Sequence, residues 1–113
     1  MRMDKLTSKF QMALADAQSL AVGRDQQFIE SVHLMAALLE QEGGTALSLL
    51  TKAGANLNQL RIGLGEAIDQ IPSVQGDAAG EVHLSNNLNK LLNVSDKLAQ
   101  ELYGTYAGRV RQP

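Results

Sequence analysis

The sequence contains no cysteine, and this absence excludes both a disulfide framework and thiolate chemistry. Tryptophan is also absent and aromatic residues make up only 4% of the chain, so the core must be aliphatic. The longest apolar run, at 34–39, is far shorter than the roughly 20 residues that span a bilayer. Polar residues interrupt the N-terminal stretch, which does not resemble a secretory signal. We therefore expect a cytoplasmic protein with no membrane partner.

An excess of basic residues is missing as well. Ten Lys and Arg residues stand against twelve Asp and Glu residues, which gives a formal net charge of −2. Domains that bind nucleic acids usually cluster Lys and Arg on one face, so no nucleic-acid partner is expected. Apolar residues make up 44% of the 113 residues, which is typical of one globular domain with a packed core.

The motifs of common enzyme classes are also absent. No Gly-x-x-x-x-Gly-Lys-Ser/Thr stretch occurs, so ATP hydrolysis is not expected of this chain. Glu30 and His33 have the Glu-x-x-His spacing of di-iron bundles, but those sites need a second such motif and two further Glu residues. We expect no catalytic residue, no cofactor and no metal, and interpret His33 as a packed or capping residue. Metal in the purified protein would favour the enzymatic alternative.

What the sequence does contain is helical periodicity. Apolar residues recur at the spacing of one helix face over about 6–23, 31–41, 45–52, 56–71 and 85–102. No segment alternates like a strand, and 73–84 is predicted to be a loop, so the predicted fold class is all-α. The second helix is apolar around much of its circumference and is expected to lie at the centre.

Local signals predict where these helices begin and end. Asn56 and Ser85 are residues of the N-cap type. Gly23 is expected to end the first helix in the left-handed conformation. Gly63 and Gly65 each cost about 1 kcal/mol in a helix interior relative to alanine, and we expect them to permit close packing against a neighbour.

An internal repeat relates the first and fifth predicted helices, with a shift of 78 residues from Thr7 to Ser85. The shift aligns Leu6 with Leu84, Phe10 with Leu88, Ala13 with Leu91, Leu14 with Leu92 and Leu20 with Leu98. The second copy does not continue, because no apolar helix appears at 106–113. The sequence therefore predicts one four-helix repeat plus the first helix of a second, with an apolar face left uncovered.

Several segments carry a family resemblance. Three groups of residues resemble the N-terminal Clp repeat domain of the bacterial ClpB disaggregases: 1–11 with 13–21; 28–30 with 33–34, 37–39 and Gly43-Gly44; and 91–93 with 96–100. Ser31 replaces the usual Pro, and the pattern departs after about Gln100. The resemblance implies a small helical module of two pseudo-repeats that engages unfolded or aggregated polypeptide. Full-length members form hexamers by this resemblance, but this chain alone is not expected to.

The resemblance also implies three substrate-binding residues. Thr7 matches a position linked to substrate engagement, and Leu92 and Val94 match apolar positions that help to line a peptide-binding groove. The residues themselves leave other interpretations open. A threonine at a helix start is commonly an N-cap worth about 1 kcal/mol, and Leu92 and Val94 can equally be ordinary core residues.

We expect a Clp repeat domain over 1–102 and a divergent, mobile tail over 103–113. The expected function is that of a non-enzymatic chaperone module that binds unfolded or aggregated polypeptide. One alternative is an adaptor-docking domain of the ClpA or ClpC type, which capture of a folded adaptor protein would favour. Another is a truncated fragment with no independent function, which a lost repeat in another reading frame downstream would indicate.

Overall fold

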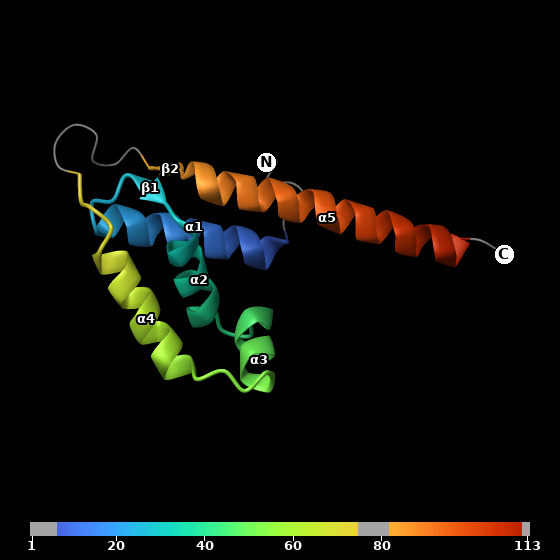
Figure 1. Ribbon diagram of the computed structural model, residues 1–113, viewed down its shortest axis with the longest axis horizontal. Helices are drawn as coiled ribbons and strands as arrows, with labels where there is room; N and C mark the ends of the chain where they lie inside the picture. Colours follow the sequence, from blue (N-terminus) through green and yellow to red (C-terminus); the bar gives the residue numbers. More distant parts are fainter. Residues whose placement is uncertain (1–6, 75–81, 112–113) are drawn as a thin grey trace.

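The computed structural model describes residues 7–74 and 82–111, with 103–111 described as backbone alone. Leu6, most of the predicted loop and residues 112–113 fall outside the described residues. The elements in chain order are α1 (Ser8–Gly23), β1 (Phe28–Ile29), α2 (Ser31–Glu40), α3 (Thr45–Lys52), α4 (Leu57–Asp69), β2 (His83–Leu84) and α5 (Asn86–Arg111) (Figure 1). The all-α prediction is confirmed.

Helix α2 occupies the centre of the arrangement, as its apolar circumference predicts. It packs against α1 on one side and against α3 and α4 on the others, while α5 runs beside α1 and projects beyond it (Figure 1). His33, Leu34 and Leu39 are the buried residues of α2. None of the helices within the described residues is long and apolar enough to cross a membrane.

The core is built from small residues on α1 and leucines on its neighbours. Ala13, Ala17 and Ala21 follow one another at four-residue spacing, which places them on one helix face, and all three are completely buried. Leu88 and Leu92 bring α5 into the same buried cluster. The aliphatic core that the lack of aromatic residues predicts is therefore present.

Helices α1 and α5 begin with the same capping hydrogen bond. The Thr7 hydroxyl oxygen accepts from the backbone N–H of Phe10 at 3.1 Å, and the Ser85 hydroxyl oxygen accepts from that of Leu88 at 3.1 Å. Each satisfies a donor that the first turn of a helix leaves unpaired. The 78-residue shift inferred from the sequence thus relates two helix starts of the same geometry. Asn56 caps α4 in the same way, as predicted.

A short parallel strand pair attaches the start of α5 to the segment before α2. Phe28 pairs with His83 and Ile29 with Leu84, and the Ser85 N–H donates to the Ile29 carbonyl at 3.0 Å. The sequence predicts no strand here. Two-residue strands are too short to show the alternation by which strands are recognised in a sequence.

The conformation predicted at the end of α1 and the predicted end of α5 both differ from the structure. Helix α1 does end at Gly23, but the left-handed residue is Asp25, with φ of 56°; aspartate tolerates this conformation better than most residues. Helix α5 was predicted to end near Leu102 and instead continues to Arg111. Under the 78-residue shift Gly23 corresponds to Glu101, so the second copy has no glycine where the first copy stops. Mobility of 103–113 stays a prediction.

The expected role of Gly63 and Gly65 is wrong. A Cβ atom placed on either residue would meet nothing within 4 Å outside the local helix backbone. Neither glycine therefore permits a close helix contact among the described residues.

A buried hydrogen-bond network around His33 ties α2 to the end of α4. The His33 Nδ1 accepts from the backbone N–H of Glu30 at 2.8 Å, so the proton of the neutral ring lies on Nε2 and is donated to Gln26 Oε1 at 2.6 Å. The Gln26 amide nitrogen then donates to the carbonyls of Ile68 and Ile71. His33 is completely buried, so the expected packed and capping role is confirmed.

We predict that the protein loses stability in mildly acidic solution. Burial lowers the pKa of His33 below its ordinary value of 6.5; Glu30 opposes the shift and Arg24 reinforces it. The unfolded chain therefore binds a proton at a higher pH than the folded chain does. This stabilisation is fully present above about pH 6.5 and is lost as the pH falls towards the folded pKa.

Urea unfolding between about pH 7.5 and pH 5.5 measures this effect. His33→Gln is expected to remove most of the decline in midpoint over this range. His83→Gln is the matched control, because His83 is exposed, and it should leave the decline unchanged. An equal decline in wild type and His33→Gln would contradict the prediction.

Candidate functional site

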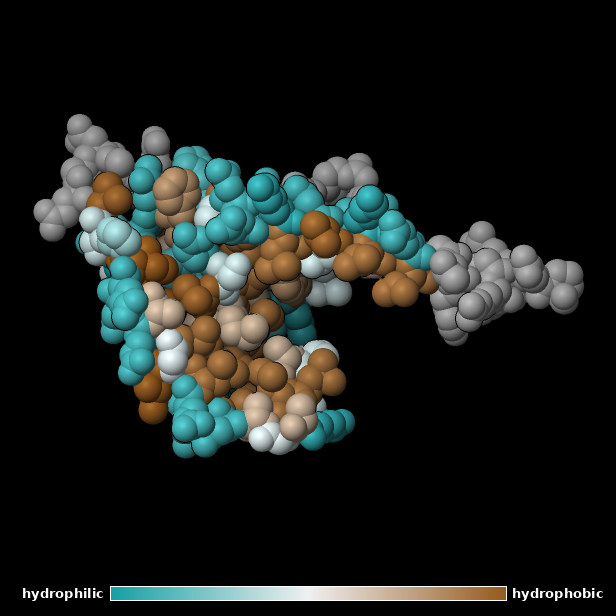
Figure 2. Space-filling model, viewed as in Figure 1, coloured by the Kyte–Doolittle hydropathy of each residue, from teal (hydrophilic) through white to brown (hydrophobic). Residues whose placement is uncertain are grey.

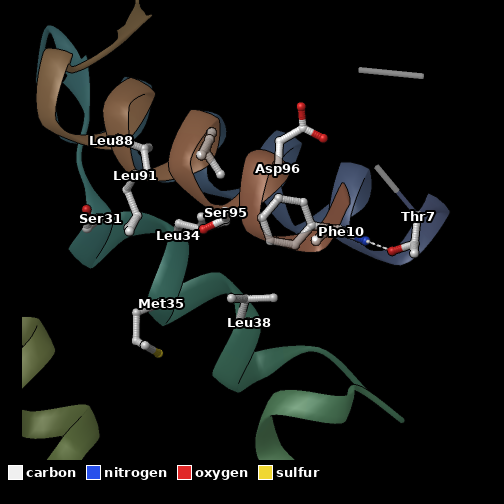
Figure 3. Close-up of a pocket in the computed structure, with 12 residues that line it drawn as sticks. Thr7, Phe10, Ser31, Leu34, Met35, Leu38, Leu88, Leu91, Ser95 and Asp96 are labelled. Atoms are coloured by element: carbon white, nitrogen blue, oxygen red, sulfur yellow. Dashed lines mark hydrogen bonds between the residues drawn. The ribbon is translucent and has the colours of Figure 1, made fainter. Parts of the chain in front are cut away.

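A groove of about 500 Å³ opens between the start of α1, one face of α2 and α5 (Figure 3). Helices α1 and α2 contribute Thr7, Phe10, Ser31, Leu34, Met35 and Leu38. Helix α5 contributes Leu88, Leu91, Leu92, Ser95, Asp96 and Ala99. The volume lies within the range of roughly 300–1,000 Å³ that is usual for ligand sites.

The groove has a buried apolar floor and a partly exposed apolar rim. Leu34, Leu88 and Leu92 are buried and form the floor, whereas Leu91 is 51% exposed and Met35 is 39% exposed. Figure 2 shows the apolar side chains of α5 along the edge that faces α2 and α3. A thioether side chain such as that of Met35 adapts its shape readily to different apolar partners.

The open face of α5 follows from the internal repeat. Ala13 of α1 corresponds to Leu91 of α5 under the 78-residue shift, yet Ala13 is completely buried and Leu91 is half-exposed. Helix α1 packs against α2, and Ala13 belongs to the buried core cluster. Within residues 7–74 and 82–111, no helix occupies the equivalent place over α5, and Leu91 therefore faces the groove while Leu88 and Leu92 belong to the core.

The structure brings two of the three expected substrate-binding residues together. Thr7 lies at one end of the groove and Leu92, 5% exposed, lies in its floor. Val94 is 55% exposed but is not among the residues that line the groove. Thr7 therefore combines an N-cap with a place in the groove, and the two interpretations of this residue are compatible.

Sequence reasoning missed most of the groove. Leu88, Leu91, Ser95 and Ala99 lie with Leu92 along one face of α5 at three- and four-residue spacings, so the periodicity could have found them. Met35 and the other residues of α2 carry no such signal, because only the packing of α2 against α1 places them opposite α5.

The polar groups of the groove suit hydrogen bonding. The Thr7 hydroxyl accepts from a backbone N–H and keeps its own proton to donate, as a hydroxyl can do both. Ser31 adds a second hydroxyl at the edge (Figure 3). Asp96 accepts a hydrogen bond from the Gln100 side chain at 3.2 Å.

Neither histidine nor carboxylate clusters form a metal centre in the described part of the chain. No group of three or more His, Cys, Asp or Glu residues that could hold a metal ion occurs among these residues. Both ring nitrogens of His33 are engaged in hydrogen bonds, which leaves neither available to a metal beside Glu30. The groove itself offers apolar side chains and hydroxyl groups. It can hold an apolar segment of another chain, and the hydroxyl groups can form hydrogen bonds with the backbone of that segment.

Comparison with known proteins places this chain in a family. The family model of the Clp repeat (R) N-terminal domain matches residues 5–108, and the chain belongs to this family. The match extends past Gln100, where the resemblance was expected to end. The Clp repeat domain is a non-catalytic N-terminal domain.

The curated relatives are chaperones named ClpB. The chain is 52% identical to the ClpB of Vibrio cholerae over 106 residues, and 52% identical to that of Pseudomonas putida over 101 residues. It is 35% identical to the ClpB of Bacillus cereus over 108 residues. These alignments cover 94%, 89% and 94% of the chain, but in each case only 12% of the length of the relative. The homology identifies a chaperone module.

Proposed function

We propose that the chain binds short apolar segments of unfolded or aggregated polypeptide in the groove between α1, α2 and α5. The observation that carries the proposal is the apolar rim of the groove, where the side chains of Leu91 and Met35 are partly exposed beside the buried floor. Burying a leucine-sized side chain stabilises a complex by about 1.5–3 kcal/mol. A segment that places one or two such side chains in the groove thus gains a useful but modest free energy.

Unfolded chains suit this groove better than folded surfaces do. A folded protein buries most of its large apolar side chains, whereas an unfolded or aggregated one presents them. The backbone of such a segment also needs hydrogen-bond partners, which the hydroxyl groups of Thr7, Ser31 and Ser95 can supply. The small contact area implies weak, rapidly reversible binding with little dependence on sequence.

The homology to ClpB chaperones supports this proposal. The proposed partner is unfolded or aggregated polypeptide, and the cytoplasm stays the expected compartment on the composition alone. Binding requires no ATP hydrolysis, no cofactor and no hexamer of this chain. Capture of one specific folded adaptor, without binding of unfolded chains, would favour the adaptor-docking alternative instead.

Leu91→Ser is expected to weaken binding of a carboxymethylated, permanently unfolded model protein at least about tenfold, since it removes apolar contact worth about 1.5 kcal/mol or more. Amide NMR titration of the whole chain measures both the affinity and the residues involved. The half-exposed position of Leu91 means that the fold should survive the substitution.

Val94→Ser provides the matched control. Val94 lies on the same helix and is 55% exposed, but it does not line the groove, so this variant should bind like the wild type. If Val94→Ser weakened binding and Leu91→Ser did not, the binding surface would be another face of α5. An unchanged spectrum of the wild type during titration would refute the proposal.

A further inference from the structure

A second groove lies on a different part of the molecule, between α1, α2 and α4. Its volume is about 460 Å³, and it shares no lining residue with the first groove. Leu20, Leu39, Leu64 and Ile68 supply its apolar surface. The proposed function makes no use of this groove, so a ligand bound in it would add a second binding activity to the first.

Gly65 of α4 lines this groove and leaves it open, but a glycine lowers the stability of the helix. Glycine within a helix is less stable than alanine, because the unfolded chain loses more conformational freedom on folding. Gly65 does not have a positive φ, and a Cβ at this position would meet nothing within 4 Å outside the local helix backbone. The fold of the described residues therefore does not require a glycine here. Its effect is to leave space in the groove for atoms that do not belong to this chain.

The rim of the groove carries charge of one predominant sign. The Arg61 guanidinium is paired with Glu40, with 2.8 Å between Nε and Oε1, so these two charges compensate each other. Asp16 lines the groove as well and is exposed. Within residues 7–74 and 82–111 no hydrogen bond or ion pair of its carboxylate is present. An apolar floor beside this carboxylate is complementary to an apolar side chain that has a cationic neighbour.

We propose that this groove docks a peptide segment of a partner protein in which a leucine-sized apolar side chain stands next to an arginine or lysine. The apolar side chain fills the space beside Gly65 between Leu39 and Leu64, and the cation pairs with Asp16. The first groove differs in two respects: no glycine of the described residues lines it, and its carboxylate, Asp96, already accepts a hydrogen bond from the Gln100 side chain. The two grooves thus select different segments.

The test uses the whole chain and a blocked peptide of sequence Gly-Ser-Leu-Arg-Ser-Gly as probe. In an amide NMR titration, the shifts are expected to centre on Leu20, Leu39 and Leu64. Gly65→Leu is expected to weaken binding at least about tenfold because its side chain occupies the groove. The same variant should raise the thermal unfolding midpoint, since leucine is the better helix former. A loss of binding together with a gain in stability cannot result from misfolding.

Gly63→Leu is the matched control in the same helix. A Cβ at Gly63 would also meet nothing within 4 Å outside the local helix backbone, but Gly63 does not line the groove. This variant should gain stability and bind the peptide like the wild type. Asp16→Asn should abolish the preference for this peptide over one with serine in place of the arginine. Replacing the leucine of the peptide by serine should remove binding.

Three results would overturn the proposal. One is the absence of shifts around this groove up to millimolar peptide. Another is equal affinity of Gly65→Leu and Gly63→Leu for the peptide. The third is a shift pattern centred on Phe10 and Met35, which would assign the peptide to the first groove. Leu91→Ser should leave peptide binding unchanged, so failure of the proposed function and failure of this second site are distinguishable.

Discussion

Leu88→Ala is expected to lower the free energy of unfolding by about 3 kcal/mol. Leu88 is completely buried and joins the core cluster beside Ala13 and Ala17 of α1. Truncation removes apolar burial and leaves a cavity that the rigid helices around it fill only in part. Because a domain of this size is stable by only about 5–15 kcal/mol, the loss is a large fraction of the total.

The same substitution should also free α5 locally. The described anchors of α5 to the rest of the fold are Leu88, Leu92 and the strand pair at 83–84. Losing one of these anchors favours opening of α5 before the remaining helices unfold. Hydrogen exchange should show faster exchange in α5 than in α2, and binding of unfolded protein should fall because the groove loses a wall.

Leu91→Ala is the control for this prediction. It removes the same atoms from the next leucine along the helix, but from a side chain that is 51% exposed. We expect a loss of less than about 1 kcal/mol. Urea unfolding measures both variants, and equal losses would show that Leu88 does not anchor α5 in the core.

His33→Ala is expected to lower the free energy of unfolding by about 3 kcal/mol, from a lost hydrogen-bond network and a new cavity. The substitution removes the acceptor of the Glu30 N–H and the donor to Gln26 Oε1. Gln26 is 3% exposed, so its carbonyl oxygen would be left unpaired away from water. The end of α4 should loosen as well, because Gln26 also holds the Ile68 and Ile71 carbonyls.

A double-mutant cycle with Gln26→Ala separates the contribution of the hydrogen-bond network to stability from that of the cavity. If His33 and Gln26 act through their mutual hydrogen bond, the double variant should lose less than the sum of the single variants, by about 1–2 kcal/mol. Strictly additive losses would mean that His33 contributes by packing alone. Retention of cooperative unfolding in every variant is required for the comparison.

The helices were accessible from the sequence because their signals are local. An apolar stripe at helical spacing and a hydroxyl or amide N-cap act over one or two turns, and Thr7, Asn56 and Ser85 all cap as predicted. The strand pair was not accessible, since two residues carry no period. The predicted end of α5 is wrong. Helix α1 ends at Gly23, but the corresponding residue of α5 is Glu101, and α5 continues past it.

For the candidate site too, some features could be predicted from the sequence and others could not. Thr7, Leu92 and Val94 were named through the family resemblance, and of these Thr7 and Leu92 line the groove. Val94 lies on the same helix, but periodicity alone does not say which apolar residues face a neighbour and which face a groove. The open space beside Gly65 contradicts the expected close packing for the same reason.

The sequence by itself determined the helical class, the starts of the helices, the internal repeat and the lack of catalytic motifs, because each depends on residue types at short, fixed spacings. Only the tertiary structure decided which apolar faces are covered. Helix α2 covers the face of α1, and among the described residues no helix covers the equivalent face of α5. That difference depends on how segments far apart in the chain pack, and it leaves Leu91 of α5 half-exposed in the groove where Ala13, its counterpart in α1, is buried in the core.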